Sequence, residues 1–270
     1  MRKSGEEKQK PIAFFDSGVG GLSVLAVAVR CLPAEDFIYF GDTANAPYGR
    51  KSKAEVQALS LQAAEILIEH GCKALVVACN TATSAAVHVL RAKLPIPVIG
   101  MEPAVKPALE RGKEGKILVM ATPLTLKEEK FQNLCRRCAV DLSKVLLLPC
   151  PTLVELVERG CTEGTAVRAE LERIFASIDT ASVSTVVLGC THFLFLKDAL
   201  QQVFPAGVTF IDGNLGTVRQ LKRVLAEHDL LREQTARQGK VELMTSGGES
   251  ARQLLHRLFA DVYEKTEGLQ

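Results

Sequence analysis

The sequence contains no long apolar run, and we expect no secretory leader. None of its apolar stretches approaches the roughly 18–20 residues that a membrane-spanning helix needs. Residues 1–10 are charged, and the apolar run at 12–15 is too short for the core of a signal peptide. We therefore expect a cytoplasmic protein with no membrane partner, in which residues 1–10 form a solvated, flexible tail.

An excess of charge of one sign is missing as well. The 270 residues include 33 lysines and arginines against 31 aspartates and glutamates, which leaves a formal net charge of +2. The basic residues do not gather in one stripe, whereas a nucleic-acid-binding domain usually carries a basic patch. We accordingly expect a small-molecule substrate and no nucleic-acid partner.

Motifs for metals, nucleotides and cofactors are incomplete. The glycine pattern that begins at Gly18 would need glycine where Ser23 stands to bind a dinucleotide, and no Gly-Lys-Ser/Thr follows to make a P-loop. Cys135 and Cys138 have the spacing of zinc ligands, but the segment has a helical pattern and no second ligand pair is obvious. Residues 246–250 resemble a pyridoxal phosphate cup only weakly, and they more simply open the last helix. We predict a protein without metal or cofactor.

Cysteine, in contrast, is well represented. Eight cysteines in a long chain with 47% apolar residues are better explained as reduced thiols than as a disulfide scaffold. Two of them, Cys79 and Cys190, end matching segments, 74–79 and 185–190, in which a buried-strand pattern leads to a cysteine, polar residues and a helix-compatible segment. Free N–H groups and the helix dipole favour a thiolate at such a position. The pair predicts two thiols that face each other across one substrate.

The remaining pattern indicates an α/β protein. Short β-branched or aromatic runs alternate with segments of helical spacing such as 53–70 and 167–178, which predicts mainly parallel sheets with ligands beyond the carboxyl ends of the strands. Proline and glycine interrupt the chain near residues 100 and 206. We predict one α/β domain from residues 1–102 and 207–270, and a second from residues 103–206. The expected strands are Ile12–Asp16, Phe37–Gly41, Ala74–Cys79, Pro97–Gly100, Lys116–Ala121, Val145–Pro149, Thr185–Cys190, Val208–Asp212 and Val241–Thr245.

Two further loops carry polar groups directly after predicted strands. Asp16 and Ser17 lead into a glycine-rich turn, and glycine lets the backbone approach a ligand closely. The loop after Gly41 contains Tyr48 and Gly49, whose backbone amides could receive a carboxylate. Both segments also fit a simpler interpretation, a plain strand-to-helix turn and an ordinary polar loop.

Polar residues flank both candidate thiols. Asn80 and Thr81 follow the first cysteine, and Thr191 follows the second, so donors and acceptors lie beside each sulfur. His192, two residues after Cys190, could assist proton transfer at that thiol. A lone histidine is more often a satisfied structural residue, but its place beside a strand-end cysteine favours a functional role.

Taken together, these motifs resemble those of the glutamate racemase family. The match covers about residues 12–250, and the motifs occur in the family's order, although each alone is weak. The resemblance implies two similar α/β domains with mainly parallel sheets and an active site in the cleft between them. The matching segments are Asp16–Leu22, Gly41–Ala44, Pro47–Gly49, Ala78–Thr83, Ala121–Thr125, Val154–Glu158 and Gly189–His192.

The resemblance also implies an isomerase that racemises glutamate without a cofactor. Cys79 would take the α-proton of D-glutamate and Cys190 that of L-glutamate, with Asp16 assisting the first thiol and His192 the second. The product would be D-glutamate for peptidoglycan synthesis, and hence for the cell wall and cell shape, and the protein would form a homodimer. The substrate would be held by Asp16, Ser17, Tyr48, Gly49, Asn80, Thr81, Thr122, Glu158, Thr191 and His192.

Two departures from the family pattern and two alternatives stay open. Phe193-Leu194 replaces a common Tyr-Pro pair, and Gly213 replaces the serine of an Asp-Ser pair, but neither change removes a catalytic residue. An aspartate or hydantoin racemase would keep the mechanism, although His192 stands where the aspartate branch usually has glutamate. A non-enzymatic thiol protein, such as a redox sensor, would not need the polar neighbours of the two cysteines.

Overall fold

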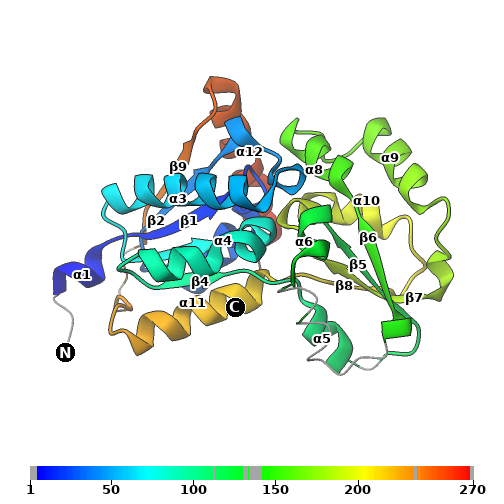
Figure 1. Cartoon of the computed structure of the whole chain (residues 1–270), viewed down its shortest axis with the longest axis horizontal. Coiled ribbons are helices and arrows are strands. Elements are labelled where there is room, and N and C mark those ends of the chain that lie inside the picture. Colours follow the sequence, from blue (N-terminus) through cyan, green and yellow to red (C-terminus); the bar gives the residue numbers. More distant parts are fainter. Residues whose placement is uncertain are drawn as a thin grey trace.

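The computed structural model describes residues 5–111, 113–129, 133, 142–233, 236 and 238–267, and it shows two lobes side by side (Figure 1). The first lobe contains a parallel sheet with the strand order β4-β3-β1-β2-β9. Its strands are β1 (Ile12–Asp16), β2 (Phe37–Gly41), β3 (Ala74–Val77), β4 (Val98–Gly100) and β9 (Val241–Thr245). Its helices are α1 (Gly5–Gln9), α2 (Leu22–Cys31), η1 (Thr43–Asn45), η2 (Tyr48–Arg50), α3 (Lys53–Glu69), α4 (Asn80–Lys93), α11 (Asn214–Glu227) and α12 (Glu249–Lys265).

The second lobe contains a four-stranded parallel sheet with the order β6-β5-β7-β8. Its strands are β5 (Lys116–Ala121), β6 (Val145–Pro149), β7 (Val183–Leu188) and β8 (Thr209–Ile211). The accompanying helices are α5 (Val105–Glu110), α6 (Pro123–Lys127), η3 (Leu142–Lys144), α8 (Pro151–Glu158), α9 (Thr165–Phe175), η4 (Thr180–Ser182), η5 (Thr191–Leu196) and α10 (Lys197–Gln201).

Helices cover both faces of the first sheet. Ile12 and Phe14 of β1 belong to the hydrophobic core that includes α2, α11 and α12, whereas Ala13 and Phe15 belong to the core formed with α3 and α4. Successive side chains of a strand point to opposite faces, so a strand buried on both faces is apolar throughout. The α2 core continues into the second lobe through α8, α9 and η5, which joins the two lobes by apolar packing.

In both sheets the chain changes from one side of a central strand to the other, and loops with predicted site residues lie at this reversal of strand order. In the first sheet the chain passes from β1 to β2 on one side and then returns to β3 on the other side of β1. In the second sheet it passes from β5 to β6 and then to β7 on the far side of β5. Ligands of open parallel sheets bind outside the carboxyl ends of the strands at such a reversal. The loops there carry Asp16 and Cys79 in the first lobe, and Thr122 and Cys190 in the second.

The structure confirms the α/β fold with parallel sheets. Five strands have the predicted bounds, and the bounds of the other four differ by one or two residues at their ends. In particular, β3 and β7 each end two residues before their cysteine. The chain leaves the sheet there, because the cysteine already begins the following helix.

Further predictions concern the N-terminal tail, the division into domains, the pair of Cys135 and Cys138, and membrane-spanning segments. Residues 5–9 of the predicted flexible tail form α1, and the Arg232 guanidinium donates a hydrogen bond to the Gln9 carbonyl. The division into domains stays a prediction, and β8, which follows its boundary at residue 206, pairs with β7 in the second sheet. Cys135 and Cys138 lie outside the described residues. Within the described part of the chain, no helix is long and apolar enough to cross a membrane.

Candidate active site

The first thiol, Cys79, caps the start of α4. Its sulfur accepts a hydrogen bond from the backbone N–H of Ala82 at 3.4 Å, and its thiol donates to Ser17 Oγ, also at 3.4 Å. Ser17 follows β1, and Cys79 follows its neighbour β3, so the pairing of two parallel strands brings the two side chains together. Cys79 is only 5% exposed. The geometry therefore unites two of the predicted site residues in a closed position.

Cys79 is a thiol, not the thiolate that its place at a helix start predicts. Burial raises the pKa of Cys79 to about 12, and the negative charge of Asp16 adds to this effect. The hydrogen bonds with Ser17 and Ala82 lower the pKa but do not outweigh burial. The prediction of a thiolate is wrong here, because the free-energy cost of burying its charge exceeds the stabilisation that one helix terminus provides.

The second thiol, Cys190, lies beside a histidine that is itself held by a carboxylate. Cys190 Sγ is 3.6 Å from His192 Nδ1, and His192 Nε2 is 2.5 Å from Glu158 Oε1. Glu158 Oε1 also accepts a hydrogen bond from the backbone N–H of Val19 at 2.9 Å. The chain of contacts from Cys190 to Val19 thus crosses from the second lobe to the first. The structure brings His192 to Cys190, as predicted, and it places Glu158 at the other ring nitrogen of His192.

The ring of His192 carries a positive charge at neutral pH. Burial alone would lower the pKa of His192, but its hydrogen bonds with Cys190 and Glu158 and their negative charges outweigh burial. The pKa of His192 is therefore raised well above its usual value. Both ring nitrogens of an imidazolium are donors, so Nδ1 points a proton towards the sulfur and Nε2 donates to Glu158.

Asp16 connects the two halves of the site. Its carboxylate is fully buried, and it accepts hydrogen bonds from the backbone N–H of Gly18 at 2.8 Å and from Thr191 Oγ1 at 3.3 Å. Burial raises the pKa of Asp16 to about 6, although the positive charge of His192 opposes this rise. Asp16 thus contacts the residue next to Cys190, and it acts on Cys79 through its charge.

Asn80 and a set of threonines supply further polar groups. The side-chain oxygen and nitrogen of Asn80 are buried, and neither has a hydrogen-bond partner among the described residues. Thr81 Oγ1 and Thr125 Oγ1 each lie 2.9 Å from Thr122 Oγ1, which links α4 to α6 across the lobes. An unsatisfied buried amide costs about 1–3 kcal/mol, so the Asn80 side chain is suited to a polar ligand. Sequence reasoning placed Thr125 in a matching segment but gave it no role in the site, although its spacing from Thr122 places both at the start of one helix.

Tyr48 holds its own loop in place. Its hydroxyl donates to Asp42 Oδ2 at 2.6 Å, and Asn45 and Ser246 donate to the same carboxylate. Burial, and then the hydrogen bond with Asp42, raise the pKa of Tyr48. Sequence reasoning did not identify this role of Asp42. The segment at Ser246 precedes α12, as predicted, and fixes the loop that contains η1 and η2.

Two glycines allow the lobes to approach each other. A Cβ atom at Gly18 would overlap the carboxylate of Glu158, which accepts the next backbone N–H. A Cβ atom at Gly49 would lie 2.8 Å from Cβ of Thr122. Gly49 therefore packs against the second lobe at the place where a carboxylate-binding amide was expected.

The two cysteines of the assembled site have different surroundings. Cys79 is a thiol, whereas Cys190 lies beside an imidazolium that attracts negative charge. The negative charge of Cys190 also contributes to the raised pKa of Cys79, so the two sulfurs belong to one electrostatic unit. Among the described residues, no group of three or more His, Cys, Asp or Glu side chains is arranged to hold a metal ion.

Known proteins resemble this chain in sequence and in architecture. Residues 20–221 match the family described as Asp/Glu/Hydantoin racemase. The chain is 50% identical over 241 residues to a glutamate racemase of Clostridium botulinum (strain Langeland), covering 88% of this chain and 91% of that protein. It resembles the crystal structure of Escherichia coli glutamate racemase in complex with L-glutamate and the activator UDP-MurNAc-ala, with a TM-score of 0.79, 31% identity and coverage of 94% and 95%. It also resembles glutamate racemase from Francisella tularensis in complex with D-glutamate, with a TM-score of 0.79, 28% identity and 94% of each chain covered.

Proposed function

The chain belongs to the Asp/Glu/Hydantoin racemase family, in which it groups with the glutamate racemases, and from this premise we propose that two cysteines racemise glutamate without a cofactor. The observation that carries the proposal is the placement of two buried thiols at equivalent strand ends of the two sheets. Cys79 follows β3 and Cys190 follows β7, and each is flanked by hydrogen-bonding groups. The two sulfurs would contact opposite faces of one substrate carbon.

Inversion at Cα requires that the α-proton leave one face and that a proton arrive at the opposite face. With Cys190 as thiolate and Cys79 as thiol, L-glutamate would lose its proton to Cys190 and receive one from Cys79, which gives D-glutamate. Cys190 is then the thiol and Cys79 the thiolate, which is the form that accepts D-glutamate. His192 would stabilise the thiolate of Cys190, and Asp16 would make a thiolate at Cys79 a stronger base by raising its pKa.

The α-proton of glutamate is a weak acid, so the developing carbanion needs stabilisation. A closed site with fixed hydrogen-bond donors provides it, because such donors need no reorganisation during the reaction. The unsatisfied amide of Asn80, at the start of α4, is suited to a substrate carboxylate, since a helix N-terminus favours an anion. We propose substrate contacts from Asp16, Ser17, Tyr48, Gly49, Asn80, Thr81, Thr122, Glu158, Thr191 and His192.

In the cell, the enzyme would supply D-glutamate for peptidoglycan synthesis in the cytoplasm. This role follows from the family and predicts that cells depleted of the protein need external D-glutamate to keep their wall and shape. We also propose a homodimer, which sedimentation velocity tests directly.

Aspartate is the main rival substrate. The argument for glutamate is His192, which forms a hydrogen-bonded pair with Glu158 in this structure. Polarimetry with L-glutamate and L-aspartate in parallel separates the two, and faster loss of optical rotation with aspartate would contradict the proposal.

Substitution of each thiol tests the mechanism. Cys79→Ser and Cys190→Ser should each lower racemisation by about 10²–10⁴-fold, because a serine hydroxyl is a poor acid–base group at neutral pH. Both variants should still bind glutamate, as a ligand-induced rise in melting temperature would show. Cys31→Ser, on α2, is the matched control and should keep wild-type activity. Full turnover by either active-site variant would reject the two-thiol scheme.

A further inference from the structure

The catalytic groups are closed off from solvent, so the substrate needs a route to them. Cys79 is 5% exposed, Cys190 is 6% exposed and Asp16 is fully buried. The side chain of Glu158, by contrast, is 14% exposed while its carboxylate contacts His192. Of these four residues, Glu158 therefore has the most exposed side chain.

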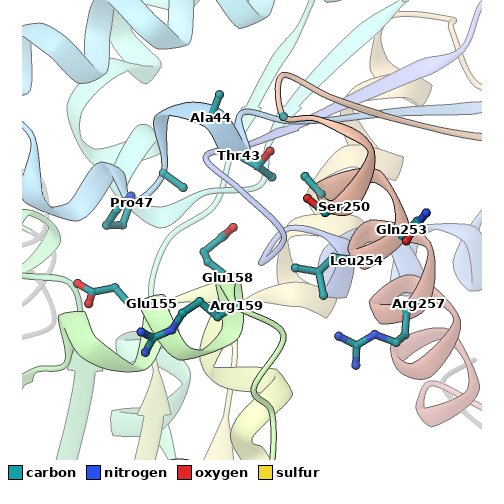
Figure 2. Close-up of a pocket in the computed structure, with 13 residues that line it drawn as sticks. Thr43, Ala44, Pro47, Glu155, Glu158, Arg159, Ser250, Gln253, Leu254 and Arg257 are labelled. Atoms are coloured by element: carbon teal, nitrogen blue, oxygen red, sulfur yellow. The ribbon is translucent and has the colours of Figure 1, made fainter.

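A cavity of about 950 Å³ opens beside Glu158. It lies between the loop at Thr43–Pro47, α12 of the first lobe and the end of α8 in the second lobe, and Figure 2 shows Glu158 between the loop and Arg159. Glu158 Oε1 contacts both His192 Nε2 and the backbone N–H of Val19. The carboxylate thus separates the cavity from the histidine that lies beside Cys190.

The charges that line the cavity do not cancel. Glu155 forms an ion pair with Arg50, and Glu158 pairs with His192. Arg159 and Arg257 also line the cavity, and neither has an ion-pair partner within the described residues. The Arg257 guanidinium lies against Gly160, directly after Arg159, so the two cations come from adjacent parts of the wall. The uncompensated charge of the cavity is therefore positive.

We propose that this cavity is the route by which the substrate reaches the thiols, that Arg159 and Arg257 attract the glutamate anion into it, and that Glu158 is the gate at its inner end. The inference rests on the proposed function for the identity of the anion. Glutamate carries a net negative charge at neutral pH, and two like charges in a concave wall raise the local concentration of such a ligand. Passage would require Glu158 to leave the Val19 N–H and swing away from His192.

Electrostatic attraction predicts a specific kinetic pattern. The arginines act before the chemical step, so their loss should raise KM and leave kcat nearly unchanged. The effect should fade with salt, because the Debye length falls from about 30 Å at 0.01 M to about 3 Å at 1 M. The two enantiomers have equal free energy, so kcat/KM must change equally in both directions.

The first experiment compares kcat and KM in variants that alter these charges. At about 0.01 M ionic strength, the double variant Arg159→Gln/Arg257→Gln should raise KM about 3- to 10-fold and change kcat less than about 2-fold, with the difference lost near 0.5 M salt. Arg159→Lys and Arg257→Lys should keep KM near the wild-type value. Arg252→Gln is the matched control for loss of one charge, because Arg252 lies on α12 like Arg257 but outside the cavity wall. A double variant with wild-type KM at low salt, or with kcat reduced as much as kcat/KM, would overturn the proposal.

A second experiment does not depend on glutamate turnover. The alkylation rates of Cys79 and Cys190 by iodoacetate, an anion, and by iodoacetamide, which is neutral, are measured by mass spectrometry of the peptides. In the double variant the ratio of the two rates should fall about 3- to 10-fold at these thiols and stay constant at the partly exposed Cys31. An unchanged ratio, or a wild-type protein in which only Cys31 reacts, would contradict the route. Absence of glutamate turnover together with a lowered ratio would contradict the proposed function alone.

Discussion

At the scale of single residues, burial and charged neighbours together set the protonation of the groups in the site. Asp16 is fully buried and has a pKa of about 6, raised from 3.8 mainly by desolvation and by the nearby charge of Glu158, with His192 opposing. The folded protein then binds more protons at Asp16 than the unfolded chain between pH 4 and 6, so stability falls as the pH rises through this window. Above it the full cost is about 3 kcal/mol, because a tenfold change in proton affinity corresponds to ~1.4 kcal/mol.

Replacement of Asp16 should reveal this cost. Asp16→Asn can keep the acceptor for the Gly18 N–H and a hydrogen bond with Thr191, but it carries no charge. We expect its free energy of unfolding to exceed the wild-type value by about 1–3 kcal/mol at pH 7.5 and to match it near pH 4, while racemisation is lost. Urea denaturation at both pH values measures this. The exposed Asp198→Asn is the control, and an equal gain at both pH values would contradict the assigned cause.

The pair of Glu158 and His192 makes a second prediction. Glu158→Gln removes a negative charge that favours the imidazolium, so the pKa of His192 should fall. With less positive charge beside Cys190, kcat/KM for glutamate should fall about 10- to 100-fold. NMR titration of labelled histidine measures the pKa, and Glu170→Gln on α9 is the control. An unchanged His192 titration would show that Glu158 does not set the charge of the ring.

At the scale of secondary-structure elements, the N-cap residues of α3 and α6 have different roles. Ser52 caps α3 with a full capping box that includes Glu55. Thr122 caps α6 by accepting a hydrogen bond from the Thr125 N–H, and its hydroxyl also contacts Thr81 in the other lobe. One cap therefore serves the helix alone, whereas the other also belongs to the site.

Paired alanine substitutions should separate these roles. Ser52→Ala and Thr122→Ala should each lower the free energy of unfolding by about 1 kcal/mol, because each removes a capping acceptor. Only Thr122→Ala should also raise KM for glutamate, by roughly 5- to 10-fold, the equivalent of one lost hydrogen bond of about 1 kcal/mol. Urea denaturation and initial-rate kinetics measure the two effects. A similar rise in KM in Ser52→Ala would mean that the effect reflects stability alone.

At the scale of the whole molecule, a buried ionic cluster ties together segments that are distant in sequence. Lys73 Nζ lies 2.5 Å from Glu35 Oε2 and donates to the Lys8 carbonyl at 2.7 Å, and the backbone N–H of Arg232 donates to Glu35 Oε1 at 2.8 Å. Lys73 immediately precedes β3, so the cluster lies at the amino ends of the strands, opposite the loops that carry Asp16 and Cys79. It connects α1, the start of β2 and the segment after α11.

Disruption of this cluster should affect stability without affecting the chemistry. Lys73→Met leaves the buried carboxylate of Glu35 without one of its cations, which should cost about 3–5 kcal/mol of unfolding free energy. Because the cluster and the thiols occupy opposite ends of the sheet, kcat and KM of the folded variant should stay within about 2-fold of wild type. Urea denaturation and steady-state kinetics at low temperature test this. Lys106→Met, which alters only an exposed ion pair with Glu110, is the control.

The strand bounds, the parallel sheets and the two cysteine loops were predictable from local patterns. A strand buried on both faces is apolar throughout, as Ile12–Phe15 shows, and polar residues directly after such a run mark the carboxyl end of the strand. The departure at Gly213, in contrast, is explained by a tertiary contact. A Cβ atom there would lie 2.7 Å from the Glu102 carbonyl oxygen, so a serine does not fit without a shift.

The sequence by itself determined which segments form strands and which thiols follow them, because periodicity and turn chemistry are properties of neighbouring residues. Only the tertiary structure decided which partners meet and how they are charged. Thr191 reaches Asp16 across 175 residues, and Val19 reaches Glu158 across 139. Burial and the charges of residues so distant in sequence set the protonation of Cys79, Asp16 and His192. A local sequence pattern shows neither how deeply a group is buried nor which distant charges lie beside it.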